Sequence, residues 1–427
     1  MNKKNVLILG SGAREHALAV KFQESPRVGN VYVMPGNDGI RMEFSTLHYE
    51  SFDDISRIIK EKAIHILFIG NEQYLADGVV DFLTTNDSLN KGETNCIVIG
   101  PTQRASMIES SKVFAKELMQ EYGIPTASSK SFHDIIAARI YLKKKKFPVV
   151  IKADGLAAGK GVLIATNEHE SNIFIEEVLS GQKFGLAGSK IIIEDYLLGE
   201  EASIFAFCDG INFVSTIFVQ DHKKALEGEK GPNTGGMGSI APLTKFSHLQ
   251  KKVDQEIFAP ILEAMQNKGC PFKGILFAGL MIKDEQIHVI EFNCRFGDPE
   301  TQVILPLLEN DLLDICEAIA QQRIKDIKLR WKNKYAINVV LASIGYPDIF
   351  QKGKEIKINN KLFKDEKIKV YFAGITEKKG VFTNSGGRVL GITVVDDTLK
   401  QAIDYVYSNI SAISSENLRY RHDIGTQ

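Results

Sequence analysis

Short apolar runs alternate with helical stretches over the first part of the chain, and this alternation restricts the fold more than any other feature. The runs lie at residues 6–9, 31–33, 64–69 and 96–99, and several of them end in glycine or asparagine. Such spacing is typical of βαβ units in a parallel sheet, whose ligands bind at the carboxyl ends of the strands. We therefore expect an N-terminal α/β domain with a ligand site at one sheet edge.

The middle of the chain follows a different pattern. Two alternating apolar runs flank Asp209-Gly210, which is a strong hairpin signal, and a second strand pair is expected at 274–282 and 286–292. A single helix is expected over 106–121, because Gly123 and a proline follow it. These elements predict an α+β domain with antiparallel sheets. A smaller third domain, with strands and one helix, is expected after the Lys- and Arg-rich segment near residue 330.

The balanced charge restricts the classes of ligand. The 427 residues include 52 basic and 53 acidic side chains, which gives a formal net charge of −1. A nucleic-acid partner is not expected, because such proteins concentrate basic residues, whereas small anions need only a few local cations. No apolar run reaches the ~20 residues of a membrane span, and no signal peptide is expected. Five scattered cysteines favour reduced thiols, so we expect a cytoplasmic protein without a membrane partner.

The first motif is Gly10-Ser11-Gly12-Ala13-Arg14-Glu15, which follows a strand and precedes a helix. Glycines at such a turn let the backbone approach a phosphate. A dinucleotide site is a weak interpretation, because Glu15 takes the third glycine position and no acidic residue ends the second strand. A phosphate site fits better, with Gly36-Asn37 and Gly70-Asn71-Glu72 facing the same crevice. For each loop alone, a turn required only for packing is an equal alternative.

The second motif is a glycine- and alanine-rich stretch between Lys152 and Gly161, with Gly159 and Lys160 near its end. Its glycine spacing differs from a Walker A loop, and Gly161 replaces the required Ser or Thr. Small residues flanked by lysines between two strands instead suggest a flap that closes over a triphosphate, with Lys152 as a point charge. A solvated lysine loop is the alternative.

Two further motifs are less specific. Residues 193–203 contain carboxylates at a strand end that could hold an adenine edge and ribose hydroxyls, although surface carboxylates are the commoner explanation. The loop from Asp221 to Gly238 presents many backbone N–H groups to an anionic or zwitterionic ligand, but a disordered surface loop has a similar composition.

The most specific motif runs from Glu291 to Glu300. On a strand, Glu291, Asn293 and Arg295 would share one face, because side chains alternate. Two oxygen ligands and a guanidinium suit a Mg²⁺ that bridges phosphates and an arginine that holds a carboxylate. Cys294 would point the opposite way and is expected to pack. No nucleophilic triad assembles from the sequence.

Together these motifs closely resemble the glycinamide ribonucleotide synthetase family of the ATP-grasp superfamily. The resemblance covers the whole chain and rests on residues 149–165, 193–203, 220–238 and above all Arg295-Phe296-Gly297-Asp298-Pro299-Glu300. It implies a purine-biosynthesis ligase that joins glycine to 5-phosphoribosylamine, with ATP cleaved to ADP and phosphate through a glycyl phosphate.

The resemblance also implies the domain organisation. We expect an N-terminal parallel-sheet, pre-ATP-grasp domain at 1–103 on the substrate side. An ATP-grasp domain at 104–327 would carry a mobile flap subdomain at about 124–192. A small α+β domain would follow at 328–427.

Site residues are carried over from the family by position. Lys152, Arg295 and Asp221 are the expected catalytic residues. ATP is expected to contact Lys112, Lys152, Gly159, Lys160, Gly161, Glu194, Asp195, Tyr196, Leu197 and Glu201. Mg²⁺ or Mn²⁺ would bind Glu291 and Asn293. Glycine and phosphoribosylamine are expected at Gly10, Ser11, Gly12, Arg14, Glu15, Gly36, Asn37, Glu72, Asp221, Asn233, Thr234, Gly235, Gly236, Arg295, Gly297 and Asp298.

The sequence departs from the family at a few positions. Ala13 replaces a usual glycine, Asn71 replaces a usual proline, and residues 277–281 offer no acidic metal ligand. The rival hypotheses are another ATP-grasp ligase or carboxylase, a nicotinamide-dependent dehydrogenase and a binding module without activity. We expect a monomer or weak oligomer.

Overall fold

The N-terminal residues form the predicted parallel sheet. The computed structural model describes residues 3–85, 95–157 and 160–426, and its first five strands lie parallel in the order β3-β2-β1-β4-β5. The strands are β1 (Lys4–Gly10), β2 (Val28–Pro35), β3 (Ser45–Thr46), β4 (Ile64–Ile69) and β5 (Ile97–Ile99). The helices between them are α1 (Ala13–Gln23), α2 (Phe52–Glu61), α3 (Glu72–Ala76) and α4 (Val79–Thr85). The apolar run in β1 is buried, as expected for a central strand covered on both faces.

The middle of the chain contains two four-stranded sheets. One has the order β11-β10-β16-β17 and the other the order β6-β9-β7-β8. The first consists of β10 (Glu200–Asp209), β11 (Phe213–Ser215), β16 (Lys273–Lys283) and β17 (Gln286–Asn293). The second consists of β6 (Ser129–Phe132), β7 (Val149–Ala153), β8 (Val162–Ala165) and β9 (Ile191–Asp195), with α7 (Ile135–Leu142) and α8 (Glu168–Leu179). The hairpin at Asp209-Gly210 is confirmed, because β10 and β11 pair antiparallel around it.

The single helix predicted over 106–121 is wrong, because two helices occupy this segment. They are α5 (Gln103–Ser110) and α6 (Lys112–Glu121). Ser111 between them has extended dihedral angles, and its hydroxyl accepts a hydrogen bond from the backbone N–H of Phe114. A serine that can cap a helix competes with helix continuation. The break places Lys112 at the first turn of α6, beside the loop after β7.

A helical segment with an internal π-helical turn covers residues 250–267. It comprises α9 (Gln250–Val253), a π-helical turn at Asp254–Phe258 and α10 (Ala259–Asn267).

The C-terminal sheet includes two strands from the middle of the chain. Its order is β12-β15-β18-β23-β20, and the short β12 (Gln220–Asp221) and β15 (Gly238–Ala241) join β18 (Tyr335–Ser343). The other elements of this region are β19 (Glu355–Ile358), β20 (Ile368–Phe372), β21 (Ile375–Lys378), β22 (Val381–Asn384), β23 (Arg388–Asp396), α13 (Leu399–Asn409), β24 (Ile413–Ser414) and β25 (Leu418–Arg419). Asp221 therefore lies where the central and C-terminal regions share a sheet.

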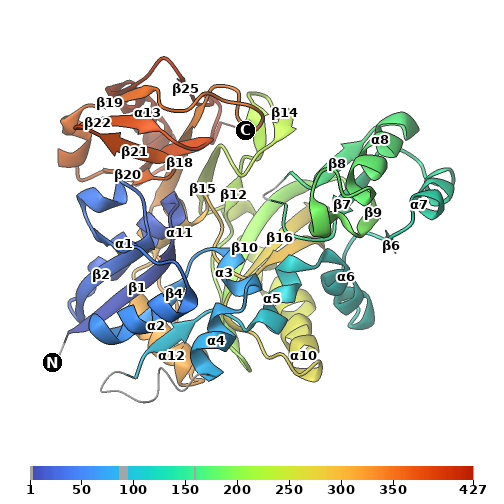
Figure 1. The fold of residues 1–427 in the computed structure, drawn as a ribbon, viewed down its shortest axis with the longest axis horizontal. Coiled ribbons are helices and arrows are strands. Elements are labelled where there is room, and N and C mark those ends of the chain that lie inside the picture. Colours follow the sequence, from blue (N-terminus) through green and yellow to red (C-terminus); the bar gives the residue numbers. More distant parts are fainter. Residues whose placement is uncertain (1–2, 86–94, 158–159, 427) are drawn as a thin grey trace.

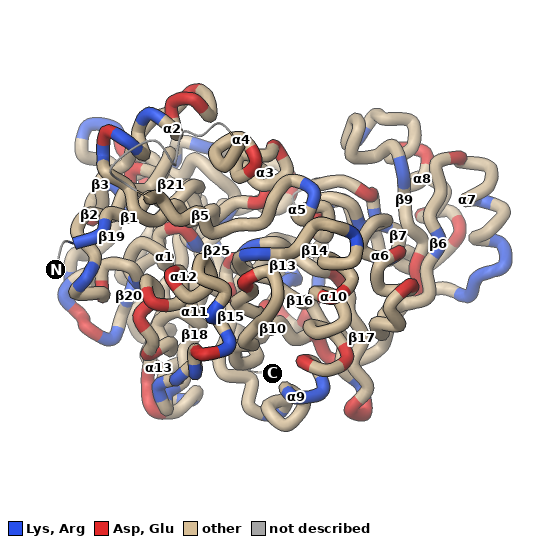
Figure 2. Tube along the Cα trace, turned by 90° about the horizontal axis from the view of Figure 1, so that it is seen from below, with Lys and Arg blue, Asp and Glu red and all other residues tan. Residues whose placement is uncertain are grey.

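Figure 1 shows the N-terminal and C-terminal regions side by side, with the sheet of β6 to β9 standing apart on the other side of the central strands. A hairpin of β13 (Lys224–Leu226) and β14 (Lys230–Asn233) lies near the C-terminus. Figure 2 shows basic and acidic residues interspersed along the chain. Within the described part of the chain, no helix has the length and apolar character that crossing a bilayer requires.

An aromatic cluster joins the N-terminal sheet to the central sheet. Phe296 follows β17, and its ring lies 5.3 Å from Phe205, 5.8 Å from Phe207 and 6.4 Å from Phe68. Phe68 belongs to β4 and the other two belong to β10. Two helices cover this core, α11 (Thr301–Leu307) and α12 (Leu312–Ala320). Packing of Phe296 fixes the adjacent Arg295 at the junction between the two regions.

Candidate active site

A cavity of about 610 Å³ lies at the junction of the N-terminal, central and C-terminal regions. A smaller cavity of about 170 Å³ adjoins it beside β7 to β9. The predicted residues that line the larger cavity are Ser11, Gly12, Arg14, Glu15, Glu72, Lys112, Lys152, Lys160, Gly161, Glu194, Asp221, Thr234, Gly235, Glu291, Asn293, Arg295, Gly297 and Asp298. Asp195, Tyr196, Leu197, Glu201 and Asn233 line the smaller one.

Four predicted residues lie behind the cavity walls. Asn37 donates from its amide to the carbonyl oxygens of Ser11 (2.8 Å) and Phe372 (3.1 Å), so it braces the first loop. Gly10, Gly36 and Gly236 all have positive φ values, and a Cβ at any of them would meet a neighbouring side chain. Gly159 lies outside the described residues.

Glu15 forms hydrogen bonds within the first glycine-rich loop. The Glu15 carboxylate accepts from the backbone N–H of Gly12 at 2.6 Å and from Arg14 Nε at 2.6 Å. It therefore occupies the position at the helix N-terminus where a phosphate of a dinucleotide would bind. Arg14 Nη1 also donates to Phe296 O at 3.1 Å, which anchors the loop to the central region.

Asn71 has a structural role at the neighbouring loop. Its side chain accepts from the backbone N–H of Gln73 at 2.9 Å and so caps α3. Asparagine is among the strongest capping residues, and α3 begins at Glu72.

Three buried charges lie at the boundary between the two cavities. Glu194 is 3.0 Å from Lys152 Nζ and 3.2 Å from Lys116 Nζ. Burial lowers the pKa of Lys116 to about 8, although Glu194 opposes this change. Sequence analysis did not identify Lys116, and its only signal was its position one turn after Lys112 on α6.

The two predicted phosphate lysines also have backbone partners. Lys152 Nζ donates to Ile290 O at 3.0 Å, and Lys112 Nζ donates to Gly155 O at 3.2 Å. Lys112 therefore contacts the glycine-rich loop after β7 and fixes the base of the expected flap.

The smaller cavity has apolar walls and a polar rim. Its apolar side chains are Val150, Val162, Ile164, Leu197, Met281 and Ile290. At the rim, Glu201 forms an ion pair of 2.9 Å with Lys223. Such a slot can accept a planar base, while carboxylate oxygens at the rim can accept from hydroxyl groups.

Glu291 is the best candidate for a metal ligand. Burial would raise the pKa of its carboxyl, but Lys223, Lys152 and Lys112 outweigh this effect and lower it. Among the described residues no group of three or more His, Cys, Asp or Glu side chains could hold a metal ion. Glu291 with Asn293 offers one carboxylate and one amide oxygen, a donor set that fits a divalent cation such as Mg²⁺, which commonly binds one or two carboxylates together with other oxygens.

Asn293 lies beside Glu291, and its amide orientation follows from its neighbours. Its nitrogen donates to Phe292 O at 2.8 Å, and its oxygen accepts from Arg295 Nη1 at 3.3 Å. Its assignment as a metal ligand remains a prediction.

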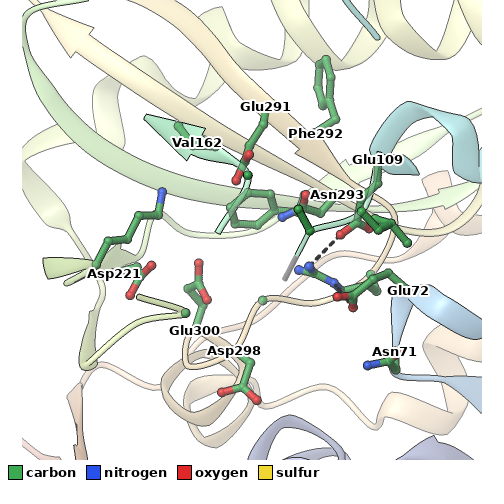
Figure 3. A pocket seen from close by; sticks show the side chains of 18 of the residues that line it. Asn71, Glu72, Glu109, Val162, Asp221, Glu291, Phe292, Asn293, Asp298 and Glu300 are labelled. Atoms are coloured by element: carbon green, nitrogen blue, oxygen red, sulfur yellow. Dashed lines mark hydrogen bonds and ion pairs between the residues drawn. The ribbon is translucent and has the colours of Figure 1, made fainter. Parts of the chain in front are cut away.

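Asp221 and Glu300 form an acidic pair at the cavity wall, as Figure 3 shows. Burial raises the pKa of Asp221 well above its ordinary value, and the charge of Glu300 raises it further. Asp221 Oδ1 is buried without a hydrogen-bond partner, whereas Glu300 Oε1 accepts from Ser203 Oγ at 3.2 Å. Asp221 Oδ1 is therefore an unsatisfied acceptor at the cavity wall, where a cationic group could bind. Sequence analysis included Glu300 in the last motif but gave it no role.

The C-terminal region completes the cavity with Tyr346 and Arg388, which the sequence did not single out. The Tyr346 hydroxyl accepts from the backbone N–H of Gly235 at 2.9 Å. Arg388 donates to the carbonyl oxygens of Gly235 and Asp298, and it lies 3.3 Å from an Asp298 carboxylate oxygen. The C-terminal region therefore orients the glycine-rich loop after β14.

Comparisons with known proteins match the chain to three family models in order. They are described as the phosphoribosylglycinamide synthetase N domain (residues 4–109), ATP-grasp (A) domain (residues 110–301) and C domain (residues 336–427). A phosphoribosylamine–glycine ligase of Caldanaerobacter subterraneus is 42% identical over 425 residues, which cover 98% of this chain and 99% of the relative.

The chain is also similar to solved structures. A phosphoribosylamine–glycine ligase from Thermotoga maritima has a TM-score of 0.85 and 33% identity, covering 98% of this chain and all of the other. The biotin carboxylase domain of a Hydrogenobacter thermophilus 2-oxoglutarate carboxylase, solved with MgADP and bicarbonate, has a TM-score of 0.70. It covers 98% of this chain and 92% of that domain at 16% identity, which shows a shared fold alone.

Proposed function

The chain belongs to the phosphoribosylglycinamide synthetase family, and we propose that its central cavity joins glycine to 5-phosphoribosylamine while ATP is cleaved to ADP and phosphate. The product is glycinamide ribonucleotide, an intermediate of purine biosynthesis. Identity of 42% along nearly the whole of a phosphoribosylamine–glycine ligase supports this activity. The observation that carries the proposal is one cavity lined by all three regions, with cations and carboxylates at separate places in its wall.

ATP occupies the boundary between the two cavities in this proposal. Its adenine enters the apolar slot beside Leu197, and Glu201 accepts from the ribose hydroxyls. Lys112 and Lys152 face the phosphates. Among the described residues, the hydrogen-bond and ion-pair partners of these two lysines are Glu194 and backbone carbonyl oxygens, so a triphosphate would bring them negative charge.

The reaction proceeds in two steps. A carboxylate oxygen of glycine attacks the γ-phosphorus, the bond to the β-phosphate oxygen breaks, and ADP leaves. The amine nitrogen of phosphoribosylamine then attacks the carbonyl carbon of glycyl phosphate, phosphate leaves, and the nitrogen loses a proton. Both nucleophiles belong to substrates, so the chain contributes positioning, charge and exclusion of water, with Lys152 and Arg295 stabilising negative charge.

The acidic pair gives glycine its orientation. The glycine ammonium group lies between Asp221 and Glu300, where it relieves their repulsion and provides the missing partner of Asp221 Oδ1. Its carboxylate then points toward Arg295 and the phosphates. A substrate without an ammonium group would leave the acidic pair unpartnered, so bicarbonate and formate are poor substitutes.

Glu291 and Asn293 would hold a divalent cation, Mg²⁺ or Mn²⁺, beside the phosphates. When bound, the cation neutralises charge that develops on the phosphates. Glu291 stays ionised to receive it, because three lysines lower the pKa of this carboxyl.

Phosphoribosylamine enters from the N-terminal side, along Ser11, Gly12, Arg14 and Glu72. Gly297 and Asp298 face this loop from the central region, and a Cβ at Gly12 would lie 3.3 Å from Asp298 Oδ2. Because all these residues come from one chain, a monomer or weak oligomer suffices for activity.

The test is an ADP-release assay with freshly prepared phosphoribosylamine. We expect ADP formation that depends on both glycine and the amine, together with glycinamide ribonucleotide detected by mass spectrometry. Assays with bicarbonate or formate in place of glycine serve as matched controls. ADP release that bicarbonate or formate stimulates as strongly as glycine would refute the proposal.

A further inference from the structure

Glu109 is a buried carboxylate that belongs to none of the motifs and yet holds the segment after β17 at three points. Its Oε1 accepts from Arg295 Nη2 at 2.7 Å. Its Oε2 accepts from the backbone N–H of Cys294 at 2.8 Å and from Cys294 Sγ at 3.0 Å. One side chain on α5 therefore fixes both the backbone and the arginine that follow the metal-binding strand.

The same arginine joins Glu109 to the N-terminal region. Arg295 Nε donates to Glu72 Oε2 at 3.0 Å, and Glu72 lies 3.8 Å from Arg14 Nη2. Arg14 in turn pairs with Glu15 at 2.6 Å. Three glutamates and two arginines thus alternate in an unbroken chain from the central strand to the first glycine-rich loop. Figure 3 shows Glu109 and Glu72 in the same part of the cavity, with the contact between Glu109 and the arginine dashed.

These contacts restrict the orientation of the guanidinium group. Arg295 uses Nε on Glu72, Nη2 on Glu109, and Nη1 on Phe296 O at 3.4 Å and on the Asn293 amide oxygen at 3.3 Å. A guanidinium has five N–H groups, so these bonds fix its plane and leave one Nη2 hydrogen for a ligand in the cavity. Charges on Glu109 and Glu72 outweigh the effect of burial and raise the pKa of Arg295, which keeps it cationic.

We propose that Glu109 is the positioning residue for Arg295 and sets the angle at which its guanidinium meets the glycine carboxylate and the transferring phosphate. The inference rests on the proposed function and assigns Glu109 a role within the same site. Glu72 holds only Nε, and the two Nη1 contacts, at 3.3 and 3.4 Å, are longer than the 2.7 Å bond from Nη2 to Glu109, which is the only charged partner of the terminal nitrogens among the described residues. The bond to Glu109 therefore fixes the guanidinium and ties it to the backbone of Cys294.

The decisive variant is Glu109→Gln, which preserves size and removes charge. A glutamine oxygen can accept from Arg295 or from the Cys294 N–H, but its NH₂ group then faces the other donor. We expect kcat for glycine-dependent ADP formation to fall at least about tenfold and KM for glycine to rise, because small misplacements of a positioning group are costly. KM for ATP should stay within about twofold of the value for the unaltered protein, because Glu109→Gln does not change the residues expected to bind ATP.

A merely structural role would give another pattern. Loss of folded protein lowers kcat and leaves both KM values unchanged, and circular dichroism would report it. The matched control is Glu117→Gln, an exposed glutamate on the adjacent α6, which should keep activity within about twofold.

The second measurement compares the effect of Glu109→Gln in the unaltered protein with its effect in an Arg295→Lys variant. If Glu109 acts through Arg295, Glu109→Gln should cost no further activity in an Arg295→Lys variant, because coupled residues are not additive. An equal loss in both backgrounds, or an unchanged KM for glycine, would overturn the inference. Failure of the proposed function is distinguishable, because the unaltered protein would then show no glycine-dependent ADP release at all.

Discussion

Lys116 provides the sharpest quantitative prediction, because its charge is buried in a cavity wall and shares one carboxylate with Lys152. Its pKa is lowered from 10.5 to about 8. Since each tenfold change in a protonation constant is worth about 1.4 kcal/mol, the charged form costs the folded protein about 3 kcal/mol near neutral pH. Replacement by methionine removes this cost and keeps the apolar stem.

Lys116→Met loses the ion pair with Glu194, whose effect is already contained in the lowered pKa, and one hydrogen bond to a neutral group. Lys116 Nζ donates to Thr126 Oγ1 at 2.6 Å, and such a bond contributes about 1 kcal/mol. The variant should therefore be more stable than the unaltered protein by about 2 kcal/mol at pH 7. Glu194 keeps Lys152 as a partner at 3.0 Å, so no buried charge is left unpaired.

The pH dependence provides an independent check. Between pH 8 and about 10.5, the folded protein has released this proton while the unfolded chain still holds it, so stability of the unaltered protein rises with pH. The advantage of Lys116→Met should shrink to about 1 kcal/mol at pH 9.

The assay is urea unfolding followed by circular dichroism at pH 7 and pH 9. Lys146→Met, at an exposed lysine in the same expected ATP-grasp domain, is the control and should change stability by less than about 0.5 kcal/mol. A Lys116→Met variant that is less stable at pH 7, or an advantage that grows at pH 9, would show that the charge is not costly.

Two further variants test the proposed chemistry. Glu291→Ala should lower ligase activity about 100-fold or more, because the cation that neutralises the phosphate charge would no longer be held. The circular dichroism spectrum should stay unchanged. Near-normal turnover would exclude Glu291 as a metal ligand. Asp221→Asn should raise KM for glycine and also raise the melting temperature of the protein without substrates. Burial and Glu300 raise the pKa of Asp221, so the stability of the unaltered protein falls as pH rises above about 4. The difference in melting temperature between Asp221→Asn and the unaltered protein should therefore grow between pH 4 and pH 8. A constant or negative difference would contradict this.

Local sequence patterns predicted the elements that depend on short-range chemistry. The alternation in the first hundred residues predicted the parallel sheet, and Asp209-Gly210 predicted a hairpin that the structure contains. The prediction of one helix over 106–121 failed, because apolar periodicity continues through Ser111 while its side chain caps a new helix. Periodicity reports which face is buried and does not report a change in helix direction.

Sequence motifs were enough to assign the family, the order of the three regions and half of the residues that line the larger cavity. These follow from motifs whose members lie close together along the chain. Only the tertiary structure decided which charges are partners, because Glu109 and Arg295 are 186 residues apart and Glu72 and Arg295 are 223 residues apart. Tyr346 and Arg388 likewise reach the cavity only because β12 and β15 join the C-terminal sheet. Charge pairing depends on distance in space and on burial, and a linear pattern of residue types contains neither quantity.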